Sequence, residues 1–503
     1  MKILNPKQLK LVDEETVITQ HISSWDLMER ASSVFVEQLL VDFPKLLSSP
    51  VFVVCGKGNN GGDGLAIARI LKARAGQIEV FLLKSERYSQ DNVINQEKLG
   101  LANIHFFTLS DQIDFANDAV IIDCLFGYGL ETALSAEWQN IIGQINGGDC
   151  LRISVDMPSG LSCETHIAKG SPIIHADIVY TFQVPKLNLL LPEYAPYVEK
   201  FSVLDIGLDN EIIQEQESSN EYVKEDLLMP LMPKRKKFSH KGTYGHALVI
   251  GGSYGKLGAV LLAAKAALRS GCGLISAGIP NCGHNVLQTA FPEAMLFTDD
   301  SDRELRKFDF PTNLSAIGIG VGMGTEEQTF QGFSSYLQSL PKNAKLVLDA
   351  DALNILALHQ NLLTYLPADT ICSPHPKELS RLIGAWESDY EKLSKAKAFA
   401  AKHQIYLIVK GANSVLLCPD GALFFNSTGN PGMATGGSGD VLTGILTSLR
   451  AQGYHAKEAA ILGMYIHGLA GDLASAKIGE ASLIASDIIQ YLPAAFNQLV
   501  GRS

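Results

Sequence analysis

Long apolar runs are absent from this 503-residue sequence, and so is an excess of basic residues. No run approaches the roughly 18 apolar residues that a membrane-spanning helix needs. The first residues, MKILNPKQLK, contain no apolar stretch of the kind found in a secretory signal. Lys and Arg number 41 against 53 Asp and Glu, a net charge of -12, which argues against nucleic acid or an anionic membrane as the main partner. We therefore expect a soluble, cytoplasmic protein without a membrane or nucleic-acid partner.

Cysteine pairs at metal-ligand spacing are also missing. The eight cysteines are scattered, and no two of them form a C-x-x-C motif. Such a distribution is typical of buried, reduced thiols rather than of a zinc site or a disulfide framework. The 46% hydrophobic and 19% charged residues are those of an ordinary globular protein.

The chain is too long for one hydrophobic core, because domains usually contain about 100–200 residues. The most polar stretch, 209–226, is followed by prolines and a KRKK run, a composition typical of a surface segment between two cores. We predict a first domain over 1–215, a linker over 216–235 and a second domain over 236–503. The KRKK run is interpreted as a solvated face, with phosphate steering as the alternative.

Both predicted domains contain short β-branched runs that alternate with longer amphipathic or Ala-rich stretches. Examples are VFVVCG, AVIIDC and RISVD in the first domain, and ALVIGGS, KLVLDA and YLIVKG in the second. This alternation predicts α/β domains with parallel sheets flanked by helices. Ligand sites in such folds lie at the carboxyl ends of the strands.

A glycine cluster, GKGNNGGDGLAIARIL, follows the first predicted strand, and Gly56, Gly58 and Gly61 formally satisfy G-x-G-x-x-G. Ordinary NAD binding would place an acid at the end of the next strand, but IEVFLLK has Lys84 there. The small residues let backbone N–H groups approach a ligand, and the neighbouring Asn and Asp side chains add polar groups. A purely structural strand-to-helix turn is the alternative.

Two further predicted strands end in an acid, Asp123 before CLFGYGL and Asp156 before MPSG. A single such acid would be interpreted as a helix cap, but two of them near an Asn-rich loop predict a polar pocket. Asp123, Asn60 and Ser159 offer hard oxygen ligands, which suit a monovalent cation better than zinc.

Taken together, GNNGGDG, the strand ending in Asp123 with LFGYGL, VDMPSGL and TFQVPK resemble the N-terminal domain of the bifunctional NAD(P)H-hydrate repair enzymes. The resemblance covers about residues 1–215. It implies a Rossmann-like epimerase domain that interconverts the R and S forms of hydrated NADH and NADPH, with potassium bound by Asn60, Asp123 and Ser159. It also implies that Asp156 lies at the reacting ring as a catalytic residue. The implied substrate contacts are Asn59, Asn60, Gly61, Gly62, Asp63, Gly127, Tyr128, Gly129, Leu130, Glu131, Thr132, Ala133 and Asp156.

In the second domain, GGSYGKLGAV is not a P-loop, because Leu257 stands where Ser or Thr must bind magnesium. Gly258 and Ala259 there let a flat ligand approach. Later, GNPGMATGGSGD precedes the apolar stretch VLTGILTSL, which places Gly436–Gly439 at the start of a helix, where free N–H groups attract anions. Asp440 either caps this helix or accepts a proton from a hydroxyl that attacks phosphorus.

The second half resembles the ribokinase-like superfamily and, within it, the ADP- or ATP-dependent NAD(P)H-hydrate dehydratases. The resemblance rests on HKGTYGHALVIGGS, PEAM, GVGMG, VLDADALN, SPHPKE, VKGANS and NPGMATGGSGD. It implies that Asp440 is the catalytic base, that ADP is the phosphoryl donor and that magnesium is a cofactor. The donor contacts so implied are Lys410, Gly411, Ala412, Asn413, Ser414, Gly436, Gly437, Ser438 and Gly439. The implied contacts of the hydrated cofactor are Gly258, Ala259, Gly322, Gly324, His375 and Asp440.

Three of these second-half features have structural alternatives. His375 between two prolines could be a rigid loop residue, and Lys410 could be a surface lysine with a buried stem. Asp349 and Asp351 could hold magnesium through water or cap the next helix, and no residue distinguishes ADP from ATP as donor.

The predicted function is repair of NADHX and NADPHX, by epimerisation in the first domain and by ADP-driven dehydration of the S form in the second. Dehydration releases NAD(P)H, AMP and phosphate. The alternative is a ribokinase-like small-molecule kinase fused to a non-catalytic ligand-binding domain. We expect a homo-oligomer.

Overall fold

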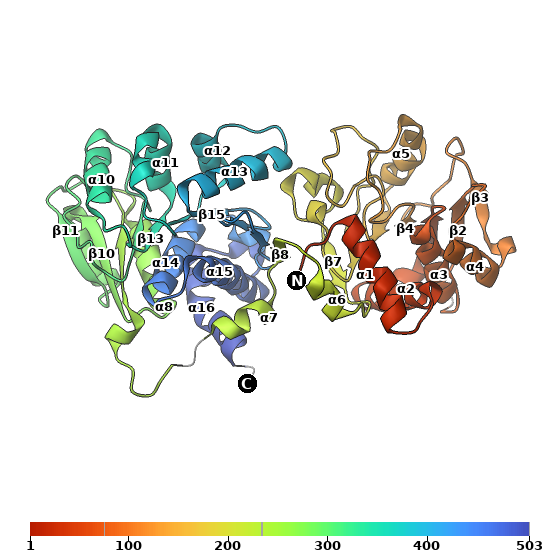
Figure 1. The fold of residues 1–503 in the computed structure, drawn as a ribbon, viewed down its shortest axis with the longest axis horizontal. Coiled ribbons are helices and arrows are strands. Elements are labelled where there is room, and N and C mark those ends of the chain that lie inside the picture. Colours follow the sequence, from red (N-terminus) through yellow and green to blue (C-terminus); the bar gives the residue numbers. More distant parts are fainter. Residues whose placement is uncertain (75, 233–234, 502–503) are drawn as a thin grey trace. The chain divides into compact units, whose positions relative to one another are not determined.

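The computed structural model of the protein describes residues 1–74, 76–232 and 235–501. These residues divide into two compact units, one over Lys2–Ser218 and one that contains Met1 and the chain from Ser219 onward. Figure 1 shows each unit as a sheet with helices packed on it. None of the helices in the described part of the chain is long and apolar enough to cross a membrane.

The N-terminal unit contains a seven-stranded sheet in the order β3-β2-β1-β4-β5-β6-β7, and all its strand pairs are parallel. This order is that of a Rossmann-like, doubly wound sheet, in agreement with the predicted fold class. All the residues of β1 and β4 are buried, as expected for central strands covered on both faces. The strands are β1 (Val51–Cys55), β2 (Ile78–Leu83), β3 (His105–Phe107), β4 (Val120–Cys124), β5 (Leu151–Val155), β6 (Ile178–Phe182) and β7 (Phe201–Leu204).

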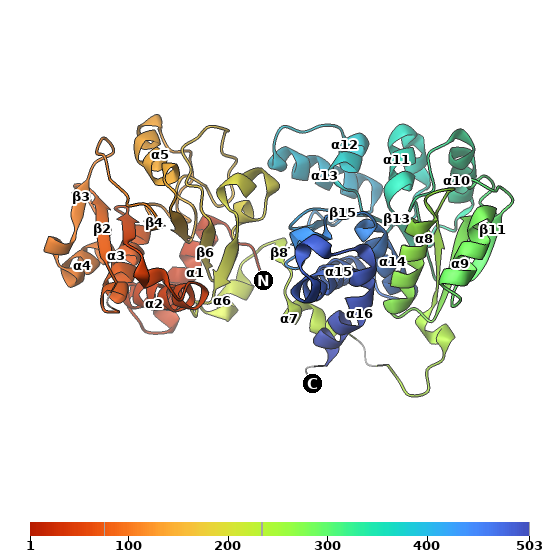
Figure 2. The same cartoon turned by 180° about the vertical axis from the view of Figure 1, so that it is seen from behind.

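Helices cover both faces of this sheet (Figure 2). The first two begin at capping boxes, in which the Asn5 and Ser23 side chains accept hydrogen bonds from the first turns of α1 and α2. The helices are α1 (Pro6–Thr19), α2 (Ser24–Asp42), α3 (Asn59–Lys72), α4 (Gln90–Leu99), α5 (Gln139–Gly147) and α6 (Asn210–Glu215).

The C-terminal unit contains a ten-stranded sheet in the order β11-β10-β9-β12-β13-β14-β15-β16-β17-β8. Strands β11 to β15 are parallel, whereas β16 runs antiparallel to both neighbours. The strands are β8 (Asn220–Tyr222), β9 (His246–Ile250), β10 (Leu274–Pro280), β11 (Met295–Asp299), β12 (Ala316–Ile319), β13 (Leu346–Leu348), β14 (Ile371–Cys372), β15 (Tyr406–Val409), β16 (Val415–Leu417) and β17 (Leu423–Phe425).

Helices of this unit pack closely through small residues, most tightly between α8 and α14. A Cβ atom on Gly444 of α14 would lie 2.1 Å from the carbonyl oxygen of Ala263 in α8, so only glycine fits there. The α-helices are α7 (Glu225–Leu228), α8 (Leu257–Arg269), α9 (His284–Ala290), α10 (Glu327–Ser339), α11 (Ala350–Leu358), α12 (Pro376–Ile383), α13 (Asp389–His403), α14 (Ser438–Ala451), α15 (Ala456–Ile478) and α16 (Ala485–Val500).

The predicted linker over 216–235 differs from the structure over most of its length. Residues from Ser219 belong to the C-terminal unit, where β8 pairs in parallel with β17 and Val223 and Leu228 are fully buried. The stretch is polar because β8 is an edge strand, so its composition looks like that of a surface segment. Residues 233–234 lie outside the described residues. All eight cysteines are free, and all except Cys282 are buried.

Candidate active sites

The first candidate site lies at the carboxyl ends of β1, β4 and β5. In the sheet register Asp123, the last residue but one of β4, is paired with Ser154 of β5, so it lies at the same edge of the sheet as Asp156, which follows β5. The N-terminus of α3 follows β1 at the same edge. The structure therefore brings Asp123, Asp156 and Asn60 to one end of the sheet, where doubly wound folds bind ligands.

Asp123 is fully buried and accepts four hydrogen bonds. One carboxylate oxygen accepts from the Ser159 hydroxyl at 2.5 Å and from the Leu125 N–H at 3.2 Å. The other accepts from the Ser154 hydroxyl and the Ser159 N–H, both at 2.8 Å. Burial raises the pKa of Asp123, and the hydrogen bonds from Ser159 oppose that rise.

The side chain of Asn60 shows whether this group of residues could bind a cation. Its Nδ2 atom is buried and has no hydrogen-bond partner among the described residues. The two ends of an amide are assigned from hydrogen bonding, so turning the amide would place Oδ1 at this position. A carboxylate, a hydroxyl and an amide oxygen are hard ligands, and these residues fit a monovalent cation.

Asp156 has a backbone φ of 68°, in the left-handed region where Asp is one of the few tolerated non-glycine residues. Its Oδ2 accepts from the N–H of Tyr128 at 3.0 Å. Its Oδ1 accepts from the ammonium of Lys186 at 2.5 Å, and the side chain of Lys186 is only 1% exposed. The strained backbone and the buried lysine together fix the carboxylate in one orientation.

Two more acids lie near Asp156. The Tyr128 hydroxyl donates to Asp13 at 2.8 Å; burial raises the pKa of Asp13 to about 6, and this hydrogen bond lowers it. Burial, followed by the charge of Asp156, raises the pKa of Asp63 well above its usual range. The sequence reasoning missed Asp13 and Lys186 as individual residues. Lys186 ends the quoted TFQVPK motif, whereas Asp13 carries no local signal on its amphipathic helix.

Only part of the loop predicted to bind substrate, Gly127–Ala133, contacts Asn60 and Asp156. A Cβ atom on Gly127 would lie 3.2 Å from the Asn60 side chain, and Tyr128 contacts Asp156. Glu131, Thr132 and Ala133 are exposed, and the carbonyl of Glu131 accepts a hydrogen bond from the Thr165 hydroxyl. No contact places Gly129 or Leu130 against Asn60 or Asp156 among the described residues.

The glycines of the first cluster have a packing role that the sequence did not reveal. A Cβ atom on Gly61 would lie 1.8 Å from the Gly56 carbonyl oxygen, and one on Gly56 would lie 2.0 Å from that of Leu125. Asn92 holds the same turn by donating to the carbonyls of Gly56 and Gly58. Asn59 is exposed in the first turn of α3, and Gly62 packs against Met28.

The second candidate site lies at the carboxyl ends of five neighbouring strands, β9, β12, β13, β14 and β15. Each of them is followed by a predicted site segment. Gly322 and Ala259 come together, because a Cβ atom on Gly322 would lie 3.0 Å from the Cβ of Ala259. Gly258, which precedes Ala259 in the first turn of α8, has open space where its side chain would be.

Helix α14 begins at Ser438, and Gly437 before it has φ 92°. A left-handed residue at this position needs glycine, and the first turn exposes N–H groups without a side-chain cap. Nothing would contact a Cβ atom on Gly436, so the loop is open on that side. This geometry suits an anion.

Asp349 is hydrogen-bonded both to α14 and to the residue that follows β15. Its carboxylate accepts from the Lys410 ammonium at 2.7 Å and from the Thr443 hydroxyl at 2.8 Å. Asp349 holds the N-cap position of α11, but its side chain makes no capping hydrogen bond. A Cβ atom on Gly439 would lie 3.3 Å from Nζ of Lys410, so the lysine lies beside the helix start rather than on an unrelated surface.

Asp440 differs from Asp349 because the structure shows no hydrogen bond to its carboxylate from any described residue. Burial raises the pKa of Asp440 to about 7, and the charge of Asp349 adds to this rise. The charge of Lys410 opposes it. A carboxyl group that titrates near neutral pH is suited to accept a proton.

His375 is the N-cap of α12, and its Nδ1 accepts hydrogen bonds from the N–H groups of Lys377 and Glu378 at 3.1 and 3.3 Å. The imidazole is 46% exposed, so one part of the ring remains accessible. The Lys410 N–H donates to the carbonyl of Pro374, the residue before His375. His375 therefore lies near the turn that begins at Lys410. In that turn the Ser414 hydroxyl accepts from the Gly411 N–H. Ala412 and Asn413 complete the turn.

His467 is a residue that sequence reasoning missed. Its Nε2 lies 3.0 Å from the carbonyl oxygen of Ser438, at the start of α14. Burial lowers the pKa of His467 to about 4, so the ring is neutral near pH 7 and its N–H donates to that carbonyl. A lone His within the apolar helix α15 gives no local signal of this role.

The fold defines an α/β enzyme with one candidate site in a Rossmann-like unit and another in a ribokinase-like unit. A family model described as NAD(P)H-hydrate dehydratase matches residues 247–494, and one described as YjeF-related protein N-terminus matches 24–188. The Moorella thermoacetica bifunctional NAD(P)H-hydrate repair enzyme is 35% identical over 95% of this chain and 93% of its own length. The chain belongs to the family of bifunctional NAD(P)H-hydrate repair enzymes.

Solved structures resemble the C-terminal unit. A ribokinase-like superfamily protein from Enterococcus faecalis is 25% identical, with a TM-score of 0.51, and covers 57% of this chain and 98% of its own. An ADP/ATP-dependent NAD(P)H-hydrate dehydratase from Bacillus subtilis, co-crystallized with ATP and Mg²⁺, is 28% identical, with a TM-score of 0.48, over 56% and 98% of the two chains. The match to bifunctional enzymes along nearly the whole chain does not favour a kinase fused to a non-catalytic domain.

Proposed function

We propose that the C-terminal unit dehydrates the S form of NADHX and NADPHX with ADP as phosphoryl donor, and that the N-terminal unit epimerises the R and S forms. The observation that carries the proposal is the position of Asp440. It is an acceptor without a hydrogen-bond partner among the described residues, in the first turn of a helix whose uncapped start suits an anion, with a pKa of about 7.

In the proposed reaction Asp440 accepts the proton of the hydroxyl group on the hydrated nicotinamide ring. The hydroxyl oxygen then attacks the terminal phosphorus of ADP, and AMP leaves. The N–H groups of Gly436–Gly439 bind the phosphoryl oxygens, and the ammonium of Lys410 opposes their charge. Phosphate then departs with the former hydroxyl oxygen, a ring proton is lost, and the double bond forms again.

Magnesium fits this arrangement only as a water-rich ion shared with the donor phosphates. Among the described residues, no three His, Cys, Asp or Glu side chains are grouped so as to hold a metal ion. Mg²⁺ usually keeps several waters and is held by one or two carboxylates plus substrate phosphates. Asp349, whose charge acts on Asp440, is the carboxylate that would hold it. Bound there, it would neutralise charge on the donor phosphates.

In the N-terminal unit, Asp156 would contact the reacting ring, and Asn60, Asp123 and Ser159 would hold potassium. The unpartnered Nδ2 of Asn60 and the buried carboxylate of Asp123 support this assignment. Potassium would supply a fixed positive charge near the substrate phosphates. The loop that begins at Gly127 would contact the nucleotide part of the substrate.

The test supplies a racemic mixture of hydrated NADH to the whole protein with ADP, and with ATP in parallel. Phosphate release and the absorbance of the reduced ring are followed together. We expect both epimers to be consumed, with ADP supporting the faster reaction. A stable phosphate ester without recovery of the reduced ring would show a kinase instead.

A further inference from the structure

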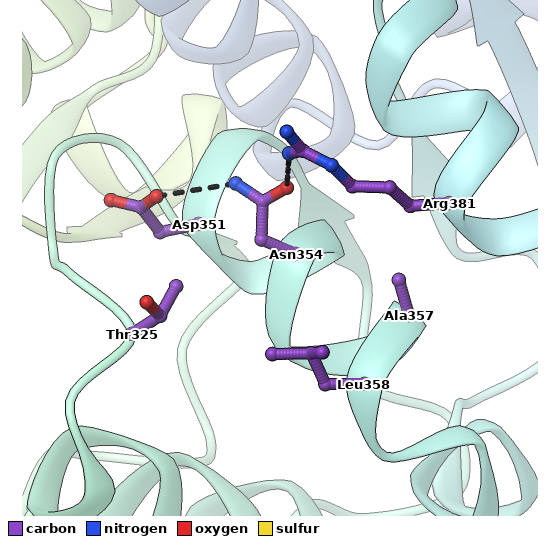
Figure 3. Close-up of a pocket in the computed structure, with 6 residues that line it drawn as sticks. All are labelled: Thr325, Asp351, Asn354, Ala357, Leu358 and Arg381. Carbon is purple, nitrogen blue, oxygen red and sulfur yellow. Dashed lines mark hydrogen bonds between the residues drawn. The ribbon is translucent and has the colours of Figure 1, made fainter.

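A cavity of about 440 Å³ lies beside the second site, between α11, α12 and the loop that follows β12. Figure 3 shows the six residues that line it. Cavities of about 300–1,000 Å³ are typical of small-ligand sites. The lining residues are Thr325, Asp351, Asn354, Ala357, Leu358 and Arg381.

The polar side of this cavity is a row of three hydrogen-bonded side chains. The Asn354 amide donates to Asp351 at 3.3 Å, and its oxygen accepts from the Arg381 guanidinium at 2.5 Å (Figure 3). Arg381 makes no ion pair with any described residue and is exposed. A guanidinium has five N–H groups, so its remaining donors can serve a ligand.

Asp351 also has capacity left for a ligand. Its carboxylate accepts one hydrogen bond from the Gly324 N–H at 2.9 Å and one from Asn354. A carboxylate can accept about four hydrogen bonds, so a sugar hydroxyl can be added.

The opposite side of the cavity is apolar. Ala357 and Leu358 end α11, and Leu358 is 74% exposed, an unusual exposure for a large apolar side chain beside a cavity. A flat base could pack on this surface. The cavity therefore combines an apolar wall, a carboxylate and a guanidinium, which match a purine, a ribose hydroxyl and a phosphate.

The cavity lies on the hydrated-cofactor side of the site rather than on the donor side. Thr325 follows Gly324 in the loop after β12, which also contains Gly322 beside Ala259. The Gly324 N–H donates to Asp351, so the cavity adjoins the loop that the hydrated cofactor is proposed to contact. The proposed donor contacts belong instead to the β15–β16 turn and the start of α14.

We infer that this cavity binds the adenosine half of the hydrated dinucleotide, with Asp351 accepting from the free 2′-hydroxyl of NADHX and Arg381 binding the 2′-phosphate of NADPHX. The inference rests on the proposed function. In dinucleotide sites an acid binds the ribose 2′-hydroxyl of NAD, and a nearby Arg accommodates the 2′-phosphate of NADP. The presence of both groups in one cavity explains how one site accepts both substrates.

The test compares KM for NADPHX and NADHX in the whole protein and in the Arg381→Ala variant, with saturating ADP. Loss of a charge-assisted pair should raise KM for NADPHX about tenfold and leave KM for NADHX and for ADP unchanged. Arg381→Lys, which keeps the charge but not the planar fork, should give an intermediate rise. Arg269→Ala is the matched control, since this exposed Arg ends α8, about 18 Å along the helix from its first residue.

An unchanged KM for NADPHX would overturn the inference, and so would an equal rise for both substrates or a rise confined to ADP. The fluorescence of bound NADPH and NADH gives a second readout that needs no turnover: Arg381→Ala should weaken only NADPH binding. If the wild type released no phosphate from either hydrate while this difference persisted, the proposed function would fail and the cavity assignment would stand.

Discussion

Asp156 and Asp440 are both predicted catalytic acids, but the two units surround them in opposite ways. Asp156 accepts hydrogen bonds from several donors, including the buried ammonium of Lys186, on a left-handed backbone. Asp440 lies in a regular helix, receives no hydrogen bond from a described residue, and has a pKa raised to about 7. A carboxylate that accepts several hydrogen bonds is held in one orientation, whereas a free one with a raised pKa is suited to take a proton.

The largest expected effect follows from Asp440→Asn. Removing a general base should lower phosphate release by about 10²–10⁴-fold, while epimerisation continues at the wild-type rate. Phosphate release and the ratio of R to S hydrate are measured on the same samples. Turnover close to that of the wild type would contradict the role of proton acceptor.

Asp156→Asn is the reciprocal variant. Asn tolerates a left-handed φ whereas Ala is strained there, so the Asn variant separates chemistry from backbone strain. We expect epimerisation to fall by at least about 10²-fold, so that the R form remains unconsumed when ADP is supplied. Wild-type rates of R-form consumption in this variant would restrict Asp156 to a structural role.

Lys186→Met removes the cationic partner of Asp156 from the buried ion pair. An uncompensated buried carboxylate should lower the free energy of unfolding by about 3–5 kcal/mol, measured by denaturant unfolding of the whole protein. Lys186→Met combined with Asp156→Asn should recover part of this loss. An unchanged unfolding curve for the single variant would show that the pair is not needed for stability.

The rate of dehydration should also depend on pH. Dehydration requires the deprotonated form of Asp440, so its kcat should rise as pH increases through about 7 and then level off. The charge of Lys410 lowers the pKa of Asp440, so Lys410→Met should move this rise in kcat to higher pH. The measurement is kcat for phosphate release at saturating substrate between pH 5 and 9, a range of about two units on each side of the pKa. If kcat of Lys410→Met rose at the same pH as that of the wild type, Asp440 would be excluded as the titrating group.

The smallest effect is expected at His375. Replacing the N-cap of α12 by Ala should cost about 1 kcal/mol of stability, whereas Asn should retain the cap. If His375 also contacts the hydrated cofactor, His375→Asn should keep the thermal unfolding midpoint and raise KM. An unchanged KM in this variant would leave His375 a helix cap only.

The sequence was sufficient to predict much of the fold and the chemistry-bearing loops. Apolar β-branched runs predicted the central parallel strands, and the glycines before VLTGIL predicted the start of α14 within a residue or two. Local patterns identify residues that end strands or begin helices. They therefore found Asp123 and Asp156, which come together because the carboxyl ends of parallel strands share one edge, and Asp440, which lies in the first turn of α14 in the other unit.

What the sequence could not reveal depends on side chains from distant segments. Asp13 reaches Tyr128, and His467 reaches Ser438, only after helices far along the chain have packed. The edge strand β8 was taken for a linker because an edge strand is polar. The individual site contacts, the bound ions, the homo-oligomer and the cytoplasmic location stay predictions.

The close packing of α8 and α14 has a mechanical consequence. Gly444 touches the backbone of Ala263, and Gly437 lies against the side chain of Leu262, so sliding of either helix would force these groups to clash. Their first turns, one beside Gly258 and one beside Asp440, therefore keep a constant spacing. We expect any adjustment during turnover to occur in the segments that face this rigid pair, the loop after β12 and the β15–β16 turn.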